Sequence, residues 1–117
     1  MNINQTELQI MKVLWAKGEM PLSQLCCILQ ETSDWKKTTI YTMVSRCVKK
    51  GYIQRIDPNF ICRPLISKEE VEKTKITDIL HNFFGDSKMN FMSAFLKNEQ
   101  LTEEEIQKLK DLIEQMK

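Results

Sequence analysis

The segment that most constrains the fold is WKKTTIYTMVSRCVKKGYI, residues 35–53, which has helical periodicity and reaches a glycine at Gly51. Apolar side chains recur on one side of the predicted helix, at positions 40, 43, 44, 47 and 48. The opposite side carries small hydroxyls, one tyrosine and a ring of cations, where a solvated face usually has glutamate and lysine. The chain must therefore fold so that one side of this helix, over about residues 36–50, covers a core and the other is displayed.

Two helices are predicted before this segment. Thr6-Glu7-Leu8-Gln9 has the form of a capping box, with Thr6 as the N-cap of a helix over about residues 7–17 that ends at Gly18. A second helix is expected over 22–31, with an inward stripe at Leu22, Leu25, Cys26 and Leu29.

Two short β-rich runs follow, over residues 52–56 and 60–66, separated by the turn signal Asp57-Pro58-Asn59. Pro64 has no amide proton, which predicts an edge position for the second run. Three helices and a hairpin in this order predict an N-terminal winged helix-turn-helix domain over residues 1–66. The expected fold class is mainly α with a small β-hairpin wing.

The remaining residues, 67–117, predict three helices, which are capped at Ser67, near Ser87 and at Thr102. The middle one is apolar nearly all round, and three helices are too few for an independent core. A second copy of the chain would cover the apolar side chains that these helices cannot bury by themselves, so we expect a helical dimerisation domain and a homodimer. The expected interface residues are Ile79, Leu80, Phe83, Phe84, Met89, Phe91, Met92, Phe95, Leu96, Leu109, Leu112, Ile113 and Met116.

Composition excludes several classes of protein. Of the 117 residues, 42% are hydrophobic and 28% charged, which is typical of a globular chain. No apolar run approaches the roughly 18 residues of a membrane span, and the start has no secretory pattern, so we expect a cytoplasmic protein without membrane insertion. The spacing of the four cysteines matches no zinc or disulfide pattern, and no nucleophile–base set occurs. We expect no metal, no cofactor and no enzymatic activity.

Charge points to a polyanion as the partner of one part of the chain. Residues 1–65 carry nine Lys/Arg and five Asp/Glu, a net +4, whereas residues 66–117 carry eight and eleven, a net −3. Short hydroxyls permit close approach to base edges, and flanking cations reach phosphates. The predicted DNA-binding residues are Lys36, Lys37, Thr38, Thr39, Tyr41, Thr42, Ser45, Arg46, Lys49, Lys50, Arg55 and Arg63. The turn at 57–59 has no cation, so the wing should make fewer phosphate contacts than a basic wing.

The run TTIYTMVSRCVKKGYI resembles the recognition-helix signature of the penicillinase-repressor family of winged-helix transcriptional repressors. ELQIMKVLW is similar to that family's first helix, and FICRPLISKEEV to its second wing strand and the start of the following helix. FFGDS with FMSAFLKNEQLTEEEIQKLKDLI is similar to its dimerisation region. The resemblance covers essentially the whole chain. It implies a bacterial repressor, associated with antibiotic resistance, that binds an inverted-repeat operator in double-stranded DNA as a homodimer and is released by an antibiotic- or metal-type stress signal. It also implies a membrane sensor protease as an indirect partner.

The chain departs from the family pattern at two places connected with release. The paired CxC tail of the copper-sensing branch is missing. In the β-lactam branch an Asn-Phe bond before the last helix is cleaved, and the corresponding pair here is Ala94-Phe95. The nature of the signal stays open.

Two other functions remain alternatives. Cys27 projects away from the apolar stripe of its helix, so a thiol-responsive winged-helix regulator is one. The other is a winged-helix module that binds proteins and has lost DNA binding. An acidic or apolar display face would favour that module, and the face of residues 36–50 is neither.

Overall fold

The computed structural model describes all residues, 1–117, and divides the chain into two compact units, Met1–Lys75 and Ile76–Lys117. The division falls within one helix.

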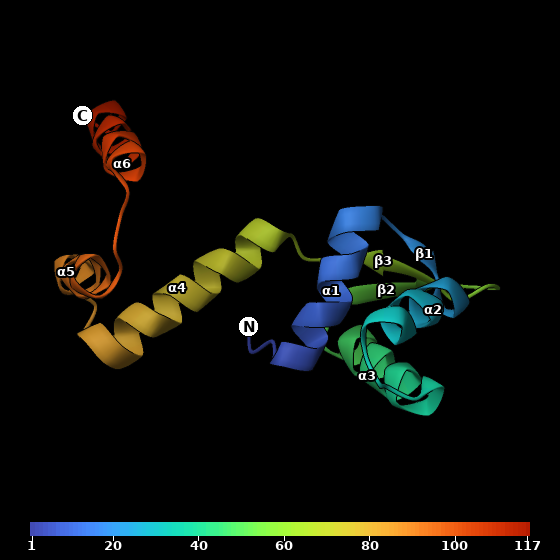
Figure 1. Cartoon of the computed structure of the whole chain (residues 1–117). Helices are drawn as coiled ribbons and strands as arrows, with labels where there is room; N and C mark the ends of the chain where they lie inside the picture. Colours follow the sequence, from blue (N-terminus) through green and yellow to red (C-terminus); the bar gives the residue numbers. More distant parts are fainter. The chain divides into compact units, whose positions relative to one another are not determined.

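The first unit is a winged helix (Figure 1). Its helices α1 (Gln5–Lys17), α2 (Leu22–Thr32) and α3 (Lys37–Lys49) pack with a small antiparallel sheet. The strands β1 (Met20–Pro21), β2 (Ile53–Ile56) and β3 (Ile61–Pro64) lie in the order β1-β3-β2. The predicted fold class, mainly α with a small β-hairpin wing, is confirmed.

The expected edge position of the second β-rich run is wrong, because β3 is the central strand. The residues around Met20, expected as an extended link, form β1 and pair with β3 at Cys62 and Ile61. Pro64 pairs only with Ile53 of β2 and lies beyond the length that β1 covers. Its missing amide proton therefore costs no hydrogen bond to β1, and a central strand tolerates the proline.

The core lies between the three helices and the sheet. The predicted stripe of α2 is buried in full, and on α1 Met11 and Leu14 are buried while Leu8 and Trp15 are partly buried. The Trp15 indole Nε1 donates a hydrogen bond of 2.9 Å to the Ile66 carbonyl, which ties the segment after β3 to α1.

The predicted N-cap at Thr6 is wrong, because α1 begins two residues earlier than expected and Asn4 caps it. Asn4 Oδ1 accepts from the Glu7 amide at 2.8 Å, and Glu7 Oε1 accepts from the Asn4 amide at 2.9 Å. The stretch Asn4–Glu7 is itself a capping box, with the carboxylate at the third helical position. This pattern overlaps with the Thr6–Gln9 pattern and competes with it. In it, each of the two side chains accepts a hydrogen bond from the backbone amide of the other residue.

The fourth helix, α4 (Lys68–Phe84), is capped at Ser67 as predicted, since Ser67 Oγ accepts from the Glu70 amide at 3.0 Å. Its first two turns belong to the first unit. Val71 is buried in the core, and Lys75 Nζ donates to the Ile3 carbonyl at 2.7 Å. The functional division into domains 1–66 and 67–117 stays a prediction.

The second unit contains the rest of α4, α5 (Lys88–Asn98) and α6 (Glu103–Gln115). Gly85 and Asp86, with φ of 54° and 64°, turn the chain between α4 and α5. Thr102 caps α6 in a capping box with Glu105, as predicted. No side chain of α5 or α6 is buried, so this unit has no core of its own.

Replacement of Asn4 tests the position of the cap. Asn4→Ala should lower the free energy of unfolding by about 0.5–2 kcal/mol, since it removes the acceptor for the Glu7 amide. Urea unfolding followed by circular dichroism measures this. Thr6→Ala is the matched control, and it should stay within about 0.5 kcal/mol of the parent. Equal losses in the two variants would contradict a cap at Asn4.

Candidate nucleic-acid interface

A hydrogen-bonded turn sets where α3 begins. Ser33 Oγ donates to the Leu29 carbonyl at 2.7 Å, which closes the end of α2, and accepts from the Trp35 amide at 3.4 Å. Gln30 Nε2 donates to the Trp35 carbonyl at 3.3 Å. The Ser33 hydroxyl therefore makes hydrogen bonds to residues on both sides of the turn, which holds the backbone at Trp35, two residues before α3 begins.

The two faces of α3 are those that the sequence predicts. Ile40, Val44 and Cys47 are buried, with Met43 and Val48 partly buried beside them. All the predicted contact residues on α3 and at its ends are exposed: Lys36, Lys37, Thr38, Thr39, Tyr41, Thr42, Ser45, Arg46, Lys49 and Lys50. The helix thus displays short hydroxyls and cations on the side opposite the core.

Thr42 is restrained within this face. Its Oγ1 donates to the Thr38 carbonyl at 2.9 Å, one helical turn earlier. The hydroxyl proton is therefore used inside the helix, while the oxygen lone pairs and the methyl group remain free for a ligand. An exocyclic amine of adenine or cytosine, or the methyl group of thymine, fits such a surface.

Four of the predicted cations have no ion pair: Lys36, Lys37, Arg46 and Lys49. Lys36 is the N-cap residue of α3 and Lys37 its first residue, whereas Arg46 and Lys49 lie in the last turn. Positive charge therefore stands at both ends of the hydroxyl face, in the arrangement expected of a helix that lies between two phosphate rows.

Lys50 differs from its neighbour Lys49, because it bonds to the buried carboxylate of Glu7. Lys50 Nζ lies 2.8 Å from Glu7 Oε2 and 3.1 Å from Oε1, and the Glu7 side chain is 0% exposed. This hydrogen bond raises the pKa of Lys50. The pair joins the first turn of α1 to the C-cap of α3.

The two arginines of the wing also have carboxylate partners. Arg55 Nε lies 3.0 Å from Asp57 Oδ1, and its guanidinium carbon is 3.9 Å from the centre of the Phe60 ring. Arg63 Nη2 lies 3.3 Å from Glu19 Oε2. Both pairs are exposed.

Sequence reasoning missed Glu7 and Glu19 because both lie outside residues 36–63, the stretch that contains all the predicted contact residues. Glu7 had a detectable signal: it lies four residues before Met11 and seven before Leu14, on the apolar stripe of α1. A carboxylate on such a stripe requires a cationic partner. Glu19, after the end of α1, had no such signal.

The cysteines divide as the sequence predicts. Cys26 and Cys47 are buried, as is Cys62, and Cys27 is exposed. Burial raises the pKa of Cys47 to about 12 and that of Cys62 to about 11, so neither thiol ionises near neutral pH. No group of three or more metal-ligating side chains occurs in the structure.

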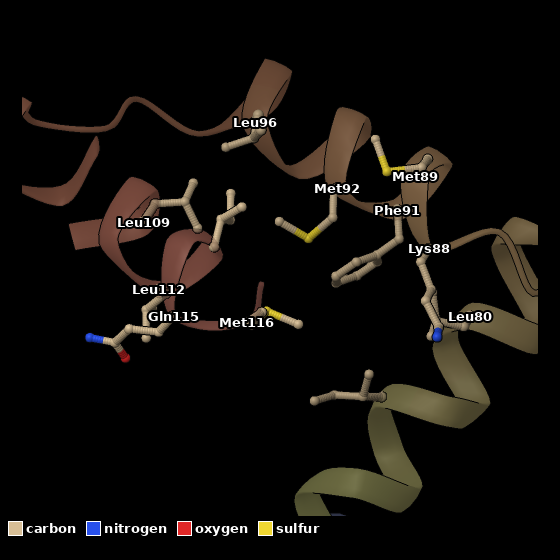
Figure 2. Close-up of a pocket in the computed structure, with 12 residues that line it drawn as sticks. Leu80, Lys88, Met89, Phe91, Met92, Leu96, Leu109, Leu112, Gln115 and Met116 are labelled. Carbon is tan, nitrogen blue, oxygen red and sulfur yellow. The ribbon is translucent and has the colours of Figure 1, made fainter. Parts of the chain in front are cut away.

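The predicted dimer residues form an apolar surface on the second unit. Most of them are exposed, among them Phe83 at 77% and Met116 at 86%. Figure 2 shows side chains of α5 and α6 that face a common hollow. The volume of this hollow is about 1160 Å³. The predicted interface residues that line it are Leu80, Met89, Phe91, Met92, Leu96, Leu109, Leu112, Ile113 and Met116. Phe84 packs edge-on against Phe91, with ring centres 5.4 Å apart; Ile79 and Phe95 are exposed.

The bond between Ala94 and Phe95 lies inside α5. The Ala94 carbonyl accepts from Asn98 Nδ2 at 2.7 Å, and the Phe95 carbonyl accepts from the Glu99 amide. Cleavage at this bond stays an open question, because the pair departs from the Asn-Phe pair of the β-lactam branch.

The fold and this surface define a winged-helix protein that displays a cationic, hydroxyl-bearing third helix. The sequence model of the penicillinase repressor family matches residues 3–115, and the chain belongs to this family. The family consists of transcriptional repressors, which confirms the prediction that the chain is not an enzyme.

Two relatives illustrate the similarity. The penicillinase repressor of Bacillus licheniformis is 31% identical over 117 residues, which cover 98% of this chain and 91% of the relative. The methicillin resistance regulatory protein MecI of Staphylococcus aureus (strain N315) is 23% identical over 113 residues, or 95% of this chain and 92% of the relative.

Two solved structures match the winged helix. The DNA-binding domain of the repressor BlaI superposes with a TM-score of 0.55 at 31% identity, covering 59% of this chain and 87% of that one. Monomeric Bacillus licheniformis BlaI in complex with the blaP half-operator gives a TM-score of 0.52 at 30% identity, covering 60% and 88%. No helix of the present chain is both long enough and apolar enough to span a membrane.

Proposed function

We propose that this chain is a sequence-specific DNA-binding transcriptional repressor, which binds an inverted-repeat operator as a homodimer and is released by a stress signal. The observation that carries the proposal is the exposed face of α3, where hydroxyls are flanked by four cations without ion pairs. Operator binding places the protein in the cytoplasm.

The shape of the face supports DNA as the ligand. An α-helix fits the major groove, and the short side chains of Thr38, Thr42 and Ser45 let its backbone approach the bases. Arg46 is long enough to reach a guanine edge or a phosphate. The similarity to BlaI, which has been solved with a half-operator, supports the same use of this fold.

The second unit supports a homodimer. An apolar surface of this extent, on a unit without a buried side chain, is unstable in water and marks an interaction site. A second copy of the chain is the occupant that we propose, because it presents the same apolar surface in a symmetric arrangement. Two winged helices linked in this way would bind the two halves of an inverted repeat.

The relatives support an antibiotic-type signal, since they are named for penicillinase and for methicillin resistance. A membrane sensor protease that acts indirectly is the partner we propose for this step. The thiol-responsive alternative rests on Cys27, the exposed thiol, since the other three are buried.

Substitutions on α3 test the DNA-binding face. Arg46→Ala and Thr42→Ala should each weaken binding to a duplex from the upstream region of the gene by about 1–3 kcal/mol for each base that the truncated side chain no longer reaches. Fluorescence anisotropy measures the affinity, and circular dichroism should show an unchanged fold. Lys12→Ala, an exposed cation on α1, is the control. Unchanged affinity in both α3 variants would place the DNA-binding surface elsewhere.

A charge in the apolar surface tests the homodimer. Phe95→Asp should give monomers by light scattering, because a carboxylate in the interface loses its hydration without a partner. The same variant should lose operator affinity, since the two half-sites are no longer linked. Asn90→Asp introduces the same group at an exposed polar position of α5 and should remain dimeric. A dimeric Phe95→Asp protein would contradict this interface.

A reporter gene behind the operator tests the signal in the native host. A β-lactam should raise transcription several-fold, whereas a thiol oxidant should leave it unchanged in both the parent and Cys27→Ser. Induction by the oxidant that Cys27→Ser abolishes would support the thiol-responsive alternative instead.

A further inference from the structure

The fold changes the charge that the sequence assigns to the DNA-binding region. Residues 36–63 contain seven cations and one carboxylate, Asp57, a net charge of +6. The structure brings two more carboxylates to these cations, Glu7 from α1 and Glu19 from the segment before β1. Seven cations and three carboxylates leave +4, which is the charge of the four cations without an ion pair: Lys37, Arg46 and Lys49 on α3, and Lys36 at its N-cap.

The three pairs differ in how firmly they are held. Arg55 is held twice, by Asp57 at 3.0 Å and by the Phe60 ring. Lys50 is the cation that compensates a carboxylate with no exposed surface, so its departure would leave a buried charge without a partner. The pair Arg63–Glu19 is exposed on both sides and has a single hydrogen bond of 3.3 Å, from Arg63 Nη2 to Glu19 Oε2.

Even a weak pair cancels the effect of its cation on a polyanion. A cation favours DNA binding because it displaces counterions condensed on the phosphates. If Arg63 turned from Glu19 towards a phosphate, the carboxylate would remain within one Debye length, about 8–10 Å, and would repel the same phosphate. The net contribution of the pair therefore stays close to zero.

We propose that Lys36, Lys37, Arg46 and Lys49 carry the electrostatic attraction of each protomer to DNA, and that Glu7, Asp57 and Glu19 cancel the contributions of Lys50, Arg55 and Arg63. This inference rests on the proposed DNA binding. It assigns the wing a positioning role without net charge, and it makes Glu19 and Asp57 negative determinants of affinity.

The salt dependence of DNA binding tests this assignment. The full chain is titrated onto a fluorescent duplex of scrambled sequence between about 50 and 200 mM KCl, so that the result does not depend on the operator. Lys49→Met should reduce the slope of log K against log salt by about 0.9 for each bound protomer. Between these salt concentrations that change is about 3.5-fold in affinity. Arg55→Met and Arg63→Met should leave the slope unchanged.

Removal of a carboxylate should have the opposite effect. Glu19→Gln frees Arg63 and should steepen the slope by up to about 0.9 for each protomer, with tighter binding at low salt. Glu31→Gln, an exposed carboxylate of α2 without an ion pair, is the matched control and should change the slope less. Because Lys50→Met threatens the fold, the two arginine variants test the proposal without that risk.

The outcomes separate this inference from the proposed function. If Arg63→Met reduces the slope as much as Lys49→Met, and Glu19→Gln leaves it unchanged, the cancellation is refuted while DNA binding stands. If the slopes follow the expected pattern but the upstream and scrambled duplexes bind equally, the four-cation assignment stands and sequence-specific repression is refuted. Absence of binding to both duplexes at about 50 mM KCl would refute both.

Discussion

The position of the displayed helix depends on one buried carboxylate. Glu7 has no exposed surface, and its two oxygens are shared between the Asn4 amide, at the start of α1, and Lys50 Nζ, at the end of α3. Displacement of the end of α3 from α1 would leave a buried charge without a partner, which is strongly unfavourable. At its other end, α3 is held by the Ser33 hydroxyl in the turn after α2. Both ends of α3 are therefore tied to the core by polar contacts, and the face between them is presented in one orientation, as a helix that reads base edges requires.

The features that could be predicted from the sequence are those set by local periodicity. The 3.6-residue repeat of apolar side chains in α3 places Val44 and Cys47 in the core and, by the same geometry, Thr42 and Arg46 outside. The caps at Ser67 and Thr102 were equally predictable, because the capping residue and its partner lie three residues apart. These features define the fold class and the display face on α3.

The features that could not be predicted join residues far apart in the chain. Lys50 is 43 residues from Glu7, and Arg63 is 44 residues from Glu19, so no window of sequence contains either pair. The third strand was missed for the same reason: Met20 and Pro21 become β1 only because β3 offers a free side. The wrong N-cap of α1, predicted at Thr6 and found at Asn4, has a different cause, because the residues involved are close in sequence. Two capping patterns overlap there, and the one that ends in a carboxylate prevails, since that carboxylate also binds Lys50.

Because few cations on the proposed DNA-binding face are unpaired, the proposed dimerisation through the second unit becomes important for the affinity for DNA. One winged helix with a net charge of +4 in its contact region has few phosphate contacts from which to gain affinity, and its hydroxyl face adds only short-range contacts. When two winged helices are linked, the second one binds its half-site at an effective concentration in the millimolar range. The affinity of the linked pair for the whole site is then much higher than that of either winged helix for one half-site. The apolar surface of α5 and α6 and the four unpaired cations at α3 are complementary under the proposed function, because a weak half-site contact would make the affinity for DNA depend on the proposed homodimer. Any signal that separates the protomers would then release the DNA without a change in α3 itself.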